Sequence, residues 1–116
     1  MGKLTTHILD VASGKPAAGV VIELYRCTPA REWLATTVSN GDGRCDSPLL
    51  EGQALVAAEY ELVFRIADYF RGTGARLTEP PFLDSIPVRF AIADPQANYH
   101  VPLLVSPWSY ATYRGS

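Results

Sequence analysis

The chain has 116 residues, a size typical of one domain, so we expect a single domain over residues 1–116. With 47% hydrophobic and 19% charged residues, its composition excludes the disordered and membrane classes, because no apolar stretch approaches the ~20 residues needed to cross a bilayer. The net charge of −2 and the lack of any basic run exclude the concentrated positive face that nucleic-acid binding requires.

The first half of the chain shows short runs of alternating apolar residues, which are typical of β-strands. Such runs cover residues 4–8, 20–24 and 32–38, and turn-forming residues separate them. The third run ends in Ser-Asn-Gly-Asp-Gly at residues 39–43, which is a loop sequence. A weaker strand is expected within residues 47–55.

The second half contains one change of period. Residues 59–66 alternate as a strand, and then Asp68 stands where a helix N-cap is expected, with Gly72 and Gly74 as a stop. This pattern predicts one short helix over about residues 67–73. Strands resume within the final third of the chain, at residues 88–92, 99–106 and 110–113. Seven to eight short antiparallel strands with one short helix predict an all-β sandwich.

The last strand is expected at the edge of a sheet. Pro102 and Pro107 lie within or beside the final strands, and proline is tolerated in sheets mainly at edges and bulges. An apolar, aromatic edge strand tends to recruit another chain unless it is covered or paired. Pairing with a symmetric copy solves this problem, so we expect a homo-oligomer.

The N-terminal segment and the cysteines indicate a cytoplasmic protein. Residues 1–7 lack the apolar core of a secretory signal. Without export, the two cysteines, Cys27 and Cys45, are expected to be free thiols rather than a disulfide.

Four separated segments carry a resemblance to a known family. They are Leu4–Asp10 followed by Gly-Lys-Pro-Ala at 14–17, then Asp42–Cys45, then Tyr99–Leu104, and finally Tyr-Arg-Gly-Ser at 113–116. In this order, and over nearly the whole chain, they resemble the 5-hydroxyisourate hydrolases, the transthyretin-related enzymes of urate breakdown. One position departs from the usual pattern, since Ala111 stands where many relatives have serine.

The resemblance implies a fold, an activity and a set of site residues. The fold would be a transthyretin-type β-sandwich, assembled as a homotetramer (a dimer of dimers) with active sites in a channel at the subunit interface. The activity would be hydrolysis of 5-hydroxyisourate to 2-oxo-4-hydroxy-4-carboxy-5-ureidoimidazoline, without a cofactor. By motif, the catalytic residues would be His7, Arg44 and His100, and the substrate-binding residues would be Tyr113, Arg114, Gly115 and Ser116.

The chemistry of these side chains fits ring hydrolysis. Attack of water on a carbonyl needs a base whose pKa lies near neutrality, which histidine offers, and either His7 or His100 fits this role. Negative charge that develops on the carbonyl oxygen can be stabilised by a fixed cation, and the planar fork of Arg44 suits a flat, oxygen-rich substrate. The hydroxyl and the carboxylate of Ser116 are both candidates to hold the substrate.

Other chemistries and functions find less support in the sequence. Two histidines without a third ligand at useful spacing do not indicate a zinc site, and no Gly-x-Ser-x-Gly motif indicates a covalent nucleophile. The main alternative is a transthyretin-like carrier that binds an aromatic ligand in the interface channel without catalysis. A structural or interaction module without a site is a second alternative, but it leaves the C-terminal tetrapeptide unexplained.

Overall fold

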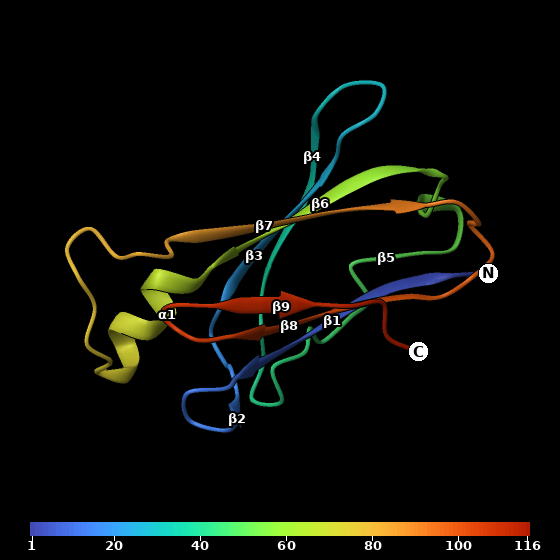
Figure 1. Ribbon diagram of the computed structural model, residues 1–116. Coiled ribbons are helices and arrows are strands. Elements are labelled where there is room, and N and C mark those ends of the chain that lie inside the picture. Colours follow the sequence, from blue (N-terminus) through green and yellow to red (C-terminus); the bar gives the residue numbers. More distant parts are fainter.

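The computed structural model, which describes residues 1–116, consists of two packed β-sheets with a helix at one end (Figure 1). The first sheet has the order β2-β1-β8-β9, and the short strand β5 pairs with the first two residues of β1. The second sheet has the order β4-β3-β6-β7. The strands span Lys3–Asp10 (β1), Lys15–Pro16 (β2), Val21–Arg26 (β3), Glu32–Val38 (β4), Leu50–Glu51 (β5), Ala58–Arg65 (β6), Ser85–Ile92 (β7), Tyr99–Val105 (β8) and Tyr110–Thr112 (β9).

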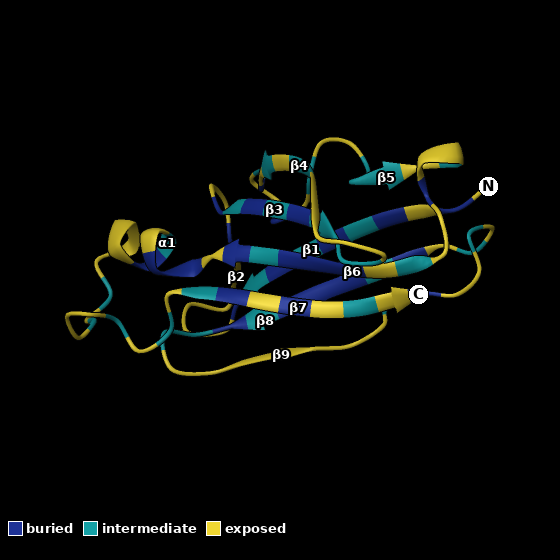
Figure 2. Ribbon diagram, turned by 90° about the horizontal axis from the view of Figure 1, so that it is seen from above, coloured by how far each residue is buried: buried dark blue, intermediate teal, exposed yellow.

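Alternation along the strands builds the core between the sheets. In β1, Leu4, Thr6 and Ile8 are buried while the residues between them are partly exposed, and β8 buries Tyr99, Val101, Leu103 and Val105. Figure 2 shows the same alternation of buried and exposed positions along β7. Since side chains alternate between the two faces of a strand, each sheet turns one face inward. The predicted all-β sandwich is confirmed.

One strand pair differs from the antiparallel arrangement that we expected. The strands β1 and β8 run parallel, with Thr5 level with His100 and His7 level with Pro102. All other strand pairs are antiparallel. Parallel neighbours need a long crossover, and here most of the chain, including the entire second sheet, forms that connection.

The short helix is confirmed, although its N-cap is not the residue that we expected. Helix α1 spans Ile66–Thr73, and its N-cap is Arg65. Asp68 instead lies in the first turn, where a carboxylate interacts favourably with the helix dipole. Gly74 ends the helix in the left-handed conformation, with φ of 79°. No helix in the structure is both long enough and apolar enough to span a membrane.

The weak strand expected within residues 47–55 is reduced to the two residues of β5. The strand ends before Gly52, because its φ of 61° is incompatible with the extended backbone of a strand. A 3₁₀ turn over Gly52–Ala54 follows. Pairing of β5 with Lys3 and Leu4 nevertheless places this segment against the beginning of β1.

The expected edge position of the last strand is confirmed, but Pro102 lies in the interior strand β8. The backbone carbonyl of His100 accepts a hydrogen bond from the Gly115 amide, so the backbone polar groups of His100 point toward the C-terminal segment. Backbone groups two residues apart in a strand point to the same side, so the backbone nitrogen of Pro102 points that way too. Proline has no N–H to donate, and none is needed there because β9 ends at Thr112. The Thr112 hydroxyl donates to the Pro102 carbonyl at 2.7 Å, so that group is satisfied.

The C-terminal end of β1 is fastened to α1 by a buried carboxylate. Asp10 is 2% exposed and accepts hydrogen bonds from the Tyr69 hydroxyl and from the amides of Ala12 and Ser13. Burial and the bond to Asp10 raise the pKa of Tyr69 to about 12. The hydroxyl therefore remains a donor, and it holds the strand that carries His7.

Cys27 and Cys45 are both free thiols, as predicted, and the structure shows that both are partly buried.

Candidate functional site

The two histidines lie on the outer face of the first sheet. Their strand neighbours Leu4, Thr6 and Val101 point into the core, so Thr5, His7 and His100 point outward. In the parallel pairing of β1 and β8, Thr5 lies directly beside His100. His7 is two residues further along β1 than Thr5, so the two histidines lie close together on this face. Two residues from opposite ends of the sequence thus share one surface.

Arg44 reaches this surface through a loop that is held against β1. The Gly43 carbonyl accepts from the Ile8 amide at 2.8 Å, and Arg44 forms an isolated antiparallel bridge with His7. The side-chain oxygen of Asn40 accepts from the Arg44 amide at 3.2 Å, while the Asn40 amide donates to the Arg44 carbonyl at 2.7 Å. Gly43 has φ of 75°, and a Cβ there would lie 2.4 Å from the Ile8 carbonyl oxygen. Only glycine permits this close approach.

The electrostatics of the cluster favour a neutral imidazole at His100. Burial lowers the pKa of His100 below its ordinary 6.5, and the positive charge of Arg44 and the proximity of His7 lower it further. A hydrogen bond to the backbone of Thr5 opposes this shift. His100 is therefore unprotonated near neutral pH, and its imidazole can accept a proton.

The C-terminal segment reaches the cluster at one residue. The Gly115 amide donates to the His100 carbonyl at 2.8 Å, in the same register as the pairing of β8 with β9. The Arg114 guanidinium instead lies 4.3 Å from the centre of the Tyr99 ring, and Tyr113 is 60% exposed. Ser116, the last residue, is exposed. The structure thus brings together His7, Arg44, His100 and Gly115, whereas Tyr113 and Arg114 line a separate groove between β7 and β9.

A small hollow of about 170 Å³ adjoins Arg44. It is lined by Thr5, Thr6, Arg44, Cys45, Asp46, Ser47 and Pro48. Burial raises the pKa of the Cys45 thiol, so the thiol is protonated at neutral pH. Among these residues, only Arg44 was named from the sequence as a candidate site residue. Thr5 had one available signal, since it precedes His7 by two residues and so shares its strand face.

Metal ligands do not gather at this surface. No group of three or more His, Cys, Asp or Glu side chains lies close enough together to hold a metal ion. The chemistry that the cluster can perform is that of a neutral imidazole beside a guanidinium: proton acceptance together with stabilisation of a developing negative charge.

These features define a class of protein: a two-layer β-sandwich that carries an imidazole and guanidinium cluster on the open face of one sheet. Residues 4–115 match the model of the HIUase/Transthyretin family. The chain belongs to this family.

The similar proteins include two that are named as enzymes and a transthyretin solved in complex with thyroxine. The chain is 59% identical to a 5-hydroxyisourate hydrolase of Mesorhizobium japonicum, over 99% of this chain and 93% of the relative. The crystal structure of (S)-allantoin synthase superposes with a TM-score of 0.96 at 44% identity, and the match covers 99% of this chain but only 44% of that longer chain. Sea bream transthyretin in complex with thyroxine superposes with a TM-score of 0.87 at 28% identity, over 97% and 94% of the two chains. The predicted family and the transthyretin-type fold are confirmed.

Proposed function

We propose that this chain hydrolyses 5-hydroxyisourate to 2-oxo-4-hydroxy-4-carboxy-5-ureidoimidazoline. The observation that carries the proposal is the convergence of His7, Arg44 and His100 on one sheet face, in a chain 59% identical to a protein named for this activity. Relatives of this name, at 42–59% identity over at least 97% of the chain, favour the enzyme over the carrier alternative. A carrier of an aromatic ligand has no need of a neutral imidazole beside a guanidinium.

In this proposal His100 is the general base. Its imidazole accepts a proton from water as the water oxygen bonds to a ring carbonyl carbon. Arg44 stabilises the negative charge on the carbonyl oxygen. The carbon–nitrogen bond of the six-membered ring then breaks, and the nitrogen takes up the proton that His100 accepted. His7, beside Arg44, provides a second hydrogen bond to the water or the substrate.

We further propose that the segment over residues 113–116 binds the substrate through Gly115 and Ser116. The support is the contact of Gly115 with His100, which places the chain end beside the base. Arg114 is held by the Tyr99 ring and by the Asn98 carbonyl, so we assign it the role of anchoring the segment. The exposed Ser116 then presents its hydroxyl to the substrate.

The activity is tested by following the absorbance of freshly generated 5-hydroxyisourate. We expect decay in proportion to protein concentration, well above the spontaneous rate. A Glu59→Gln variant, altered at an exposed residue of β6 in the second sheet, is expected to match the unsubstituted protein. Decay at the spontaneous rate in the presence of folded protein would contradict the proposal.

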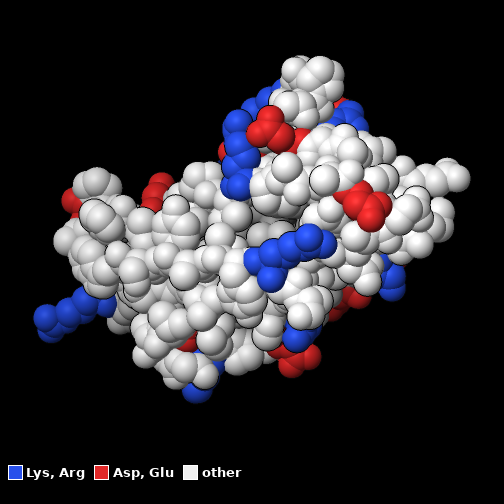
Figure 3. All heavy atoms as spheres, turned by 45° about the vertical axis from the view of Figure 1, so that its right-hand side comes forward, with Lys and Arg blue, Asp and Glu red and all other residues white.

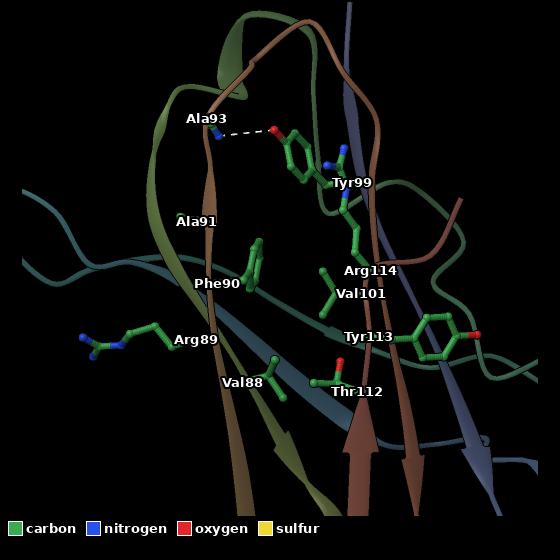
Figure 4. Close-up of a pocket in the computed structure, with 10 residues that line it drawn as sticks. All are labelled: Val88, Arg89, Phe90, Ala91, Ala93, Tyr99, Val101, Thr112, Tyr113 and Arg114. Atoms are coloured by element: carbon green, nitrogen blue, oxygen red, sulfur yellow. Dashed lines mark hydrogen bonds between the residues drawn. The ribbon is translucent and has the colours of Figure 1, made fainter.

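We also propose that the chain forms a homotetramer built as a dimer of dimers. The strands β9 and β7 are sheet edges, and a groove of about 350 Å³ lies between them. Figure 4 shows Val88, Phe90, Val101 and Thr112 projecting into this groove, while Arg89 and Tyr113 point away. Nearby, Phe82 and Trp108 are 66% and 52% exposed and lie against each other. Unpaired edges and exposed aromatic side chains favour association with a second copy.

Figure 3 shows one face of the molecule, most of which is uncharged. The two free thiols support a reducing compartment, so we propose that the protein is cytoplasmic.

The oligomeric state is tested by sedimentation at micromolar concentration, where we expect a tetramer. In the antiparallel pairing of β8 with β9, successive backbone amides of β9 point alternately toward and away from β8, and the amide of Tyr110 points away. Tyr110→Pro therefore removes a donor that a second copy would use, without removing a hydrogen bond within the sheet. We expect this variant to sediment as a smaller species. Trp33→Ala, on the far edge strand β4, is the matched control and should remain tetrameric. A monomer with full activity would contradict both the assembly and the shared site.

A further inference from the structure

The imidazole of His100 is enclosed along two of its edges. On one edge, Nδ1 lies 2.8 Å from the Thr5 hydroxyl oxygen of β1. On the other, the backbone of Gly115 lies so close that a Cβ there would be 2.5 Å from Cδ2 of the ring. Because Nδ1 and Cδ2 are the two ring atoms bonded to Cγ, the ring is held between β1 and the C-terminal segment. Cε1 and Nε2 are the ring atoms that project away from the sheet.

The direction of the hydrogen bond to Thr5 decides which nitrogen is basic. A hydroxyl can donate or accept, so the contact with Nδ1 allows either tautomer. Since Cε1 and Nε2 project away from the sheet, Nε2 is the nitrogen that can meet a water or a substrate. For Nε2 to act as the base proposed above, the neutral ring must carry its proton on Nδ1, and the Thr5 hydroxyl oxygen then accepts it.

We propose that Thr5 and Gly115 are positioning residues for His100, which fix its neutral ring as the Nδ1–H tautomer and direct the basic Nε2 toward the substrate. This inference rests on the proposed hydrolysis, and it specifies which nitrogen of which histidine accepts the proton from water. Neither residue touches the reacting atoms. They act through the ring, since the partner of one histidine nitrogen sets the protonation of the other.

The role of Gly115 gives a physical reason for a glycine in the C-terminal Tyr-Arg-Gly-Ser segment. Its amide bonds to the His100 carbonyl, so this residue must lie directly beside the strand that carries the ring. Any side chain larger than hydrogen would displace the imidazole toward β1 and distort its bond to Thr5. The end of the chain thus contributes shape to the site as well as polar groups.

Nitrogen-15 NMR of the histidine rings tests the tautomer directly. The chain has only two histidines, so a His100→Asn variant assigns both sets of signals. Above the pKa of His100, we expect Nδ1 to show the shift of a protonated nitrogen and Nε2 that of an unprotonated one. Thr5→Val should increase the share of the Nε2–H tautomer, whereas Thr5→Ser, which keeps the hydroxyl, should not. Protonation at Nε2 in the unsubstituted protein would overturn the proposal.

Kinetics with a matched control separate positioning from stability. We expect Thr5→Val to lower kcat about tenfold with little change in KM, consistent with loss of one hydrogen bond. We expect Thr5→Ser to retain most of the rate. Thr6→Val removes the neighbouring hydroxyl, which bonds to the Val101 carbonyl on the core side of the same strand pair. That variant should lose stability while keeping the tautomer and kcat, and an equal fall in kcat would overturn the assignment.

A double-mutant cycle tests whether Thr5 and Gly115 act through the same ring. We expect Gly115→Ala to reduce kcat and to shift the tautomer as Thr5→Val does. Because both changes act on His100, their effects should be clearly less than additive in the double variant. Additive effects would contradict a shared action. If the unsubstituted protein did not hydrolyse 5-hydroxyisourate, the proposed function would be wrong, while the NMR spectrum would still report separately on the ring.

Discussion

His100→Asn lowers kcat for 5-hydroxyisourate by about 10²- to 10⁴-fold, the range expected on removal of a general base. Asparagine is uncharged and smaller than histidine, and its amide can still bond to the Thr5 hydroxyl on the Nδ1 side. It cannot, however, accept a proton from water near neutral pH. The rate is measured by the decay of substrate absorbance, and folding by circular dichroism and thermal unfolding.

This prediction depends on the location of His100 at the sheet surface. Its backbone carbonyl bonds to Gly115 and its side chain is only partly buried, so the substitution leaves the backbone pairing and the core intact. We therefore expect the melting temperature to change little while kcat falls. A variant with normal turnover would remove His100 from the mechanism. A loss of rate that merely followed a loss of folded protein would give it a structural role.

Much of the sandwich is predictable from alternation alone. The run at residues 32–38 coincides with β4, the helix begins within one residue of its expected start, and Gly74 provides the stop. These features are local: side-chain parity decides which residues are buried, and a left-handed glycine ends a helix regardless of its surroundings.

The partner of each strand is a tertiary property, and it is the part that the sequence left open. Alternation in β1 and β8 shows which side chains share a face but does not say that these strands are neighbours or that they run parallel. The position of Pro102 misleads for the same reason. A proline in this interior strand is acceptable only because the neighbouring strand β9 ends at Thr112. The residues around Pro102 in the sequence do not indicate where that neighbouring strand ends.

The candidate site shows the same division. The identities of His7, Arg44 and His100 came from motifs, and their convergence then required the parallel register and the glycine turn at Gly43. The role inferred for Thr5 could not be found in this way. Thr5 and Thr6 are identical neighbours, and only the structure shows that the first hydroxyl meets the His100 ring while the second meets a core carbonyl.

Arg44→Gln lowers kcat by about 10²- to 10³-fold, the loss expected when a donor to a developing oxyanion is removed. Arg44→Lys keeps the positive charge but replaces the planar fork with a point charge, so we expect a smaller loss. Both rates are measured with the same absorbance assay. Because the loop that carries Arg44 is held by backbone contacts of Gly43 and Asn40, neither substitution should unfold it.

The two Arg44 variants should also differ in their pH profiles, and this difference tests the link between Arg44 and His100. Activity requires the neutral imidazole, so it falls on the acid side as His100 becomes protonated. Burial, Arg44 and His7 all lower the pKa of His100, which places this acid limb below pH 6.5. Arg44→Gln removes one of these causes, so the pKa rises and the acid limb moves to higher pH. Arg44→Lys retains the charge and should leave the limb near its original position. If both variants lost rate with identical, unshifted profiles, the charge of Arg44 would not act on the pKa of His100, and the inferred coupling would be wrong.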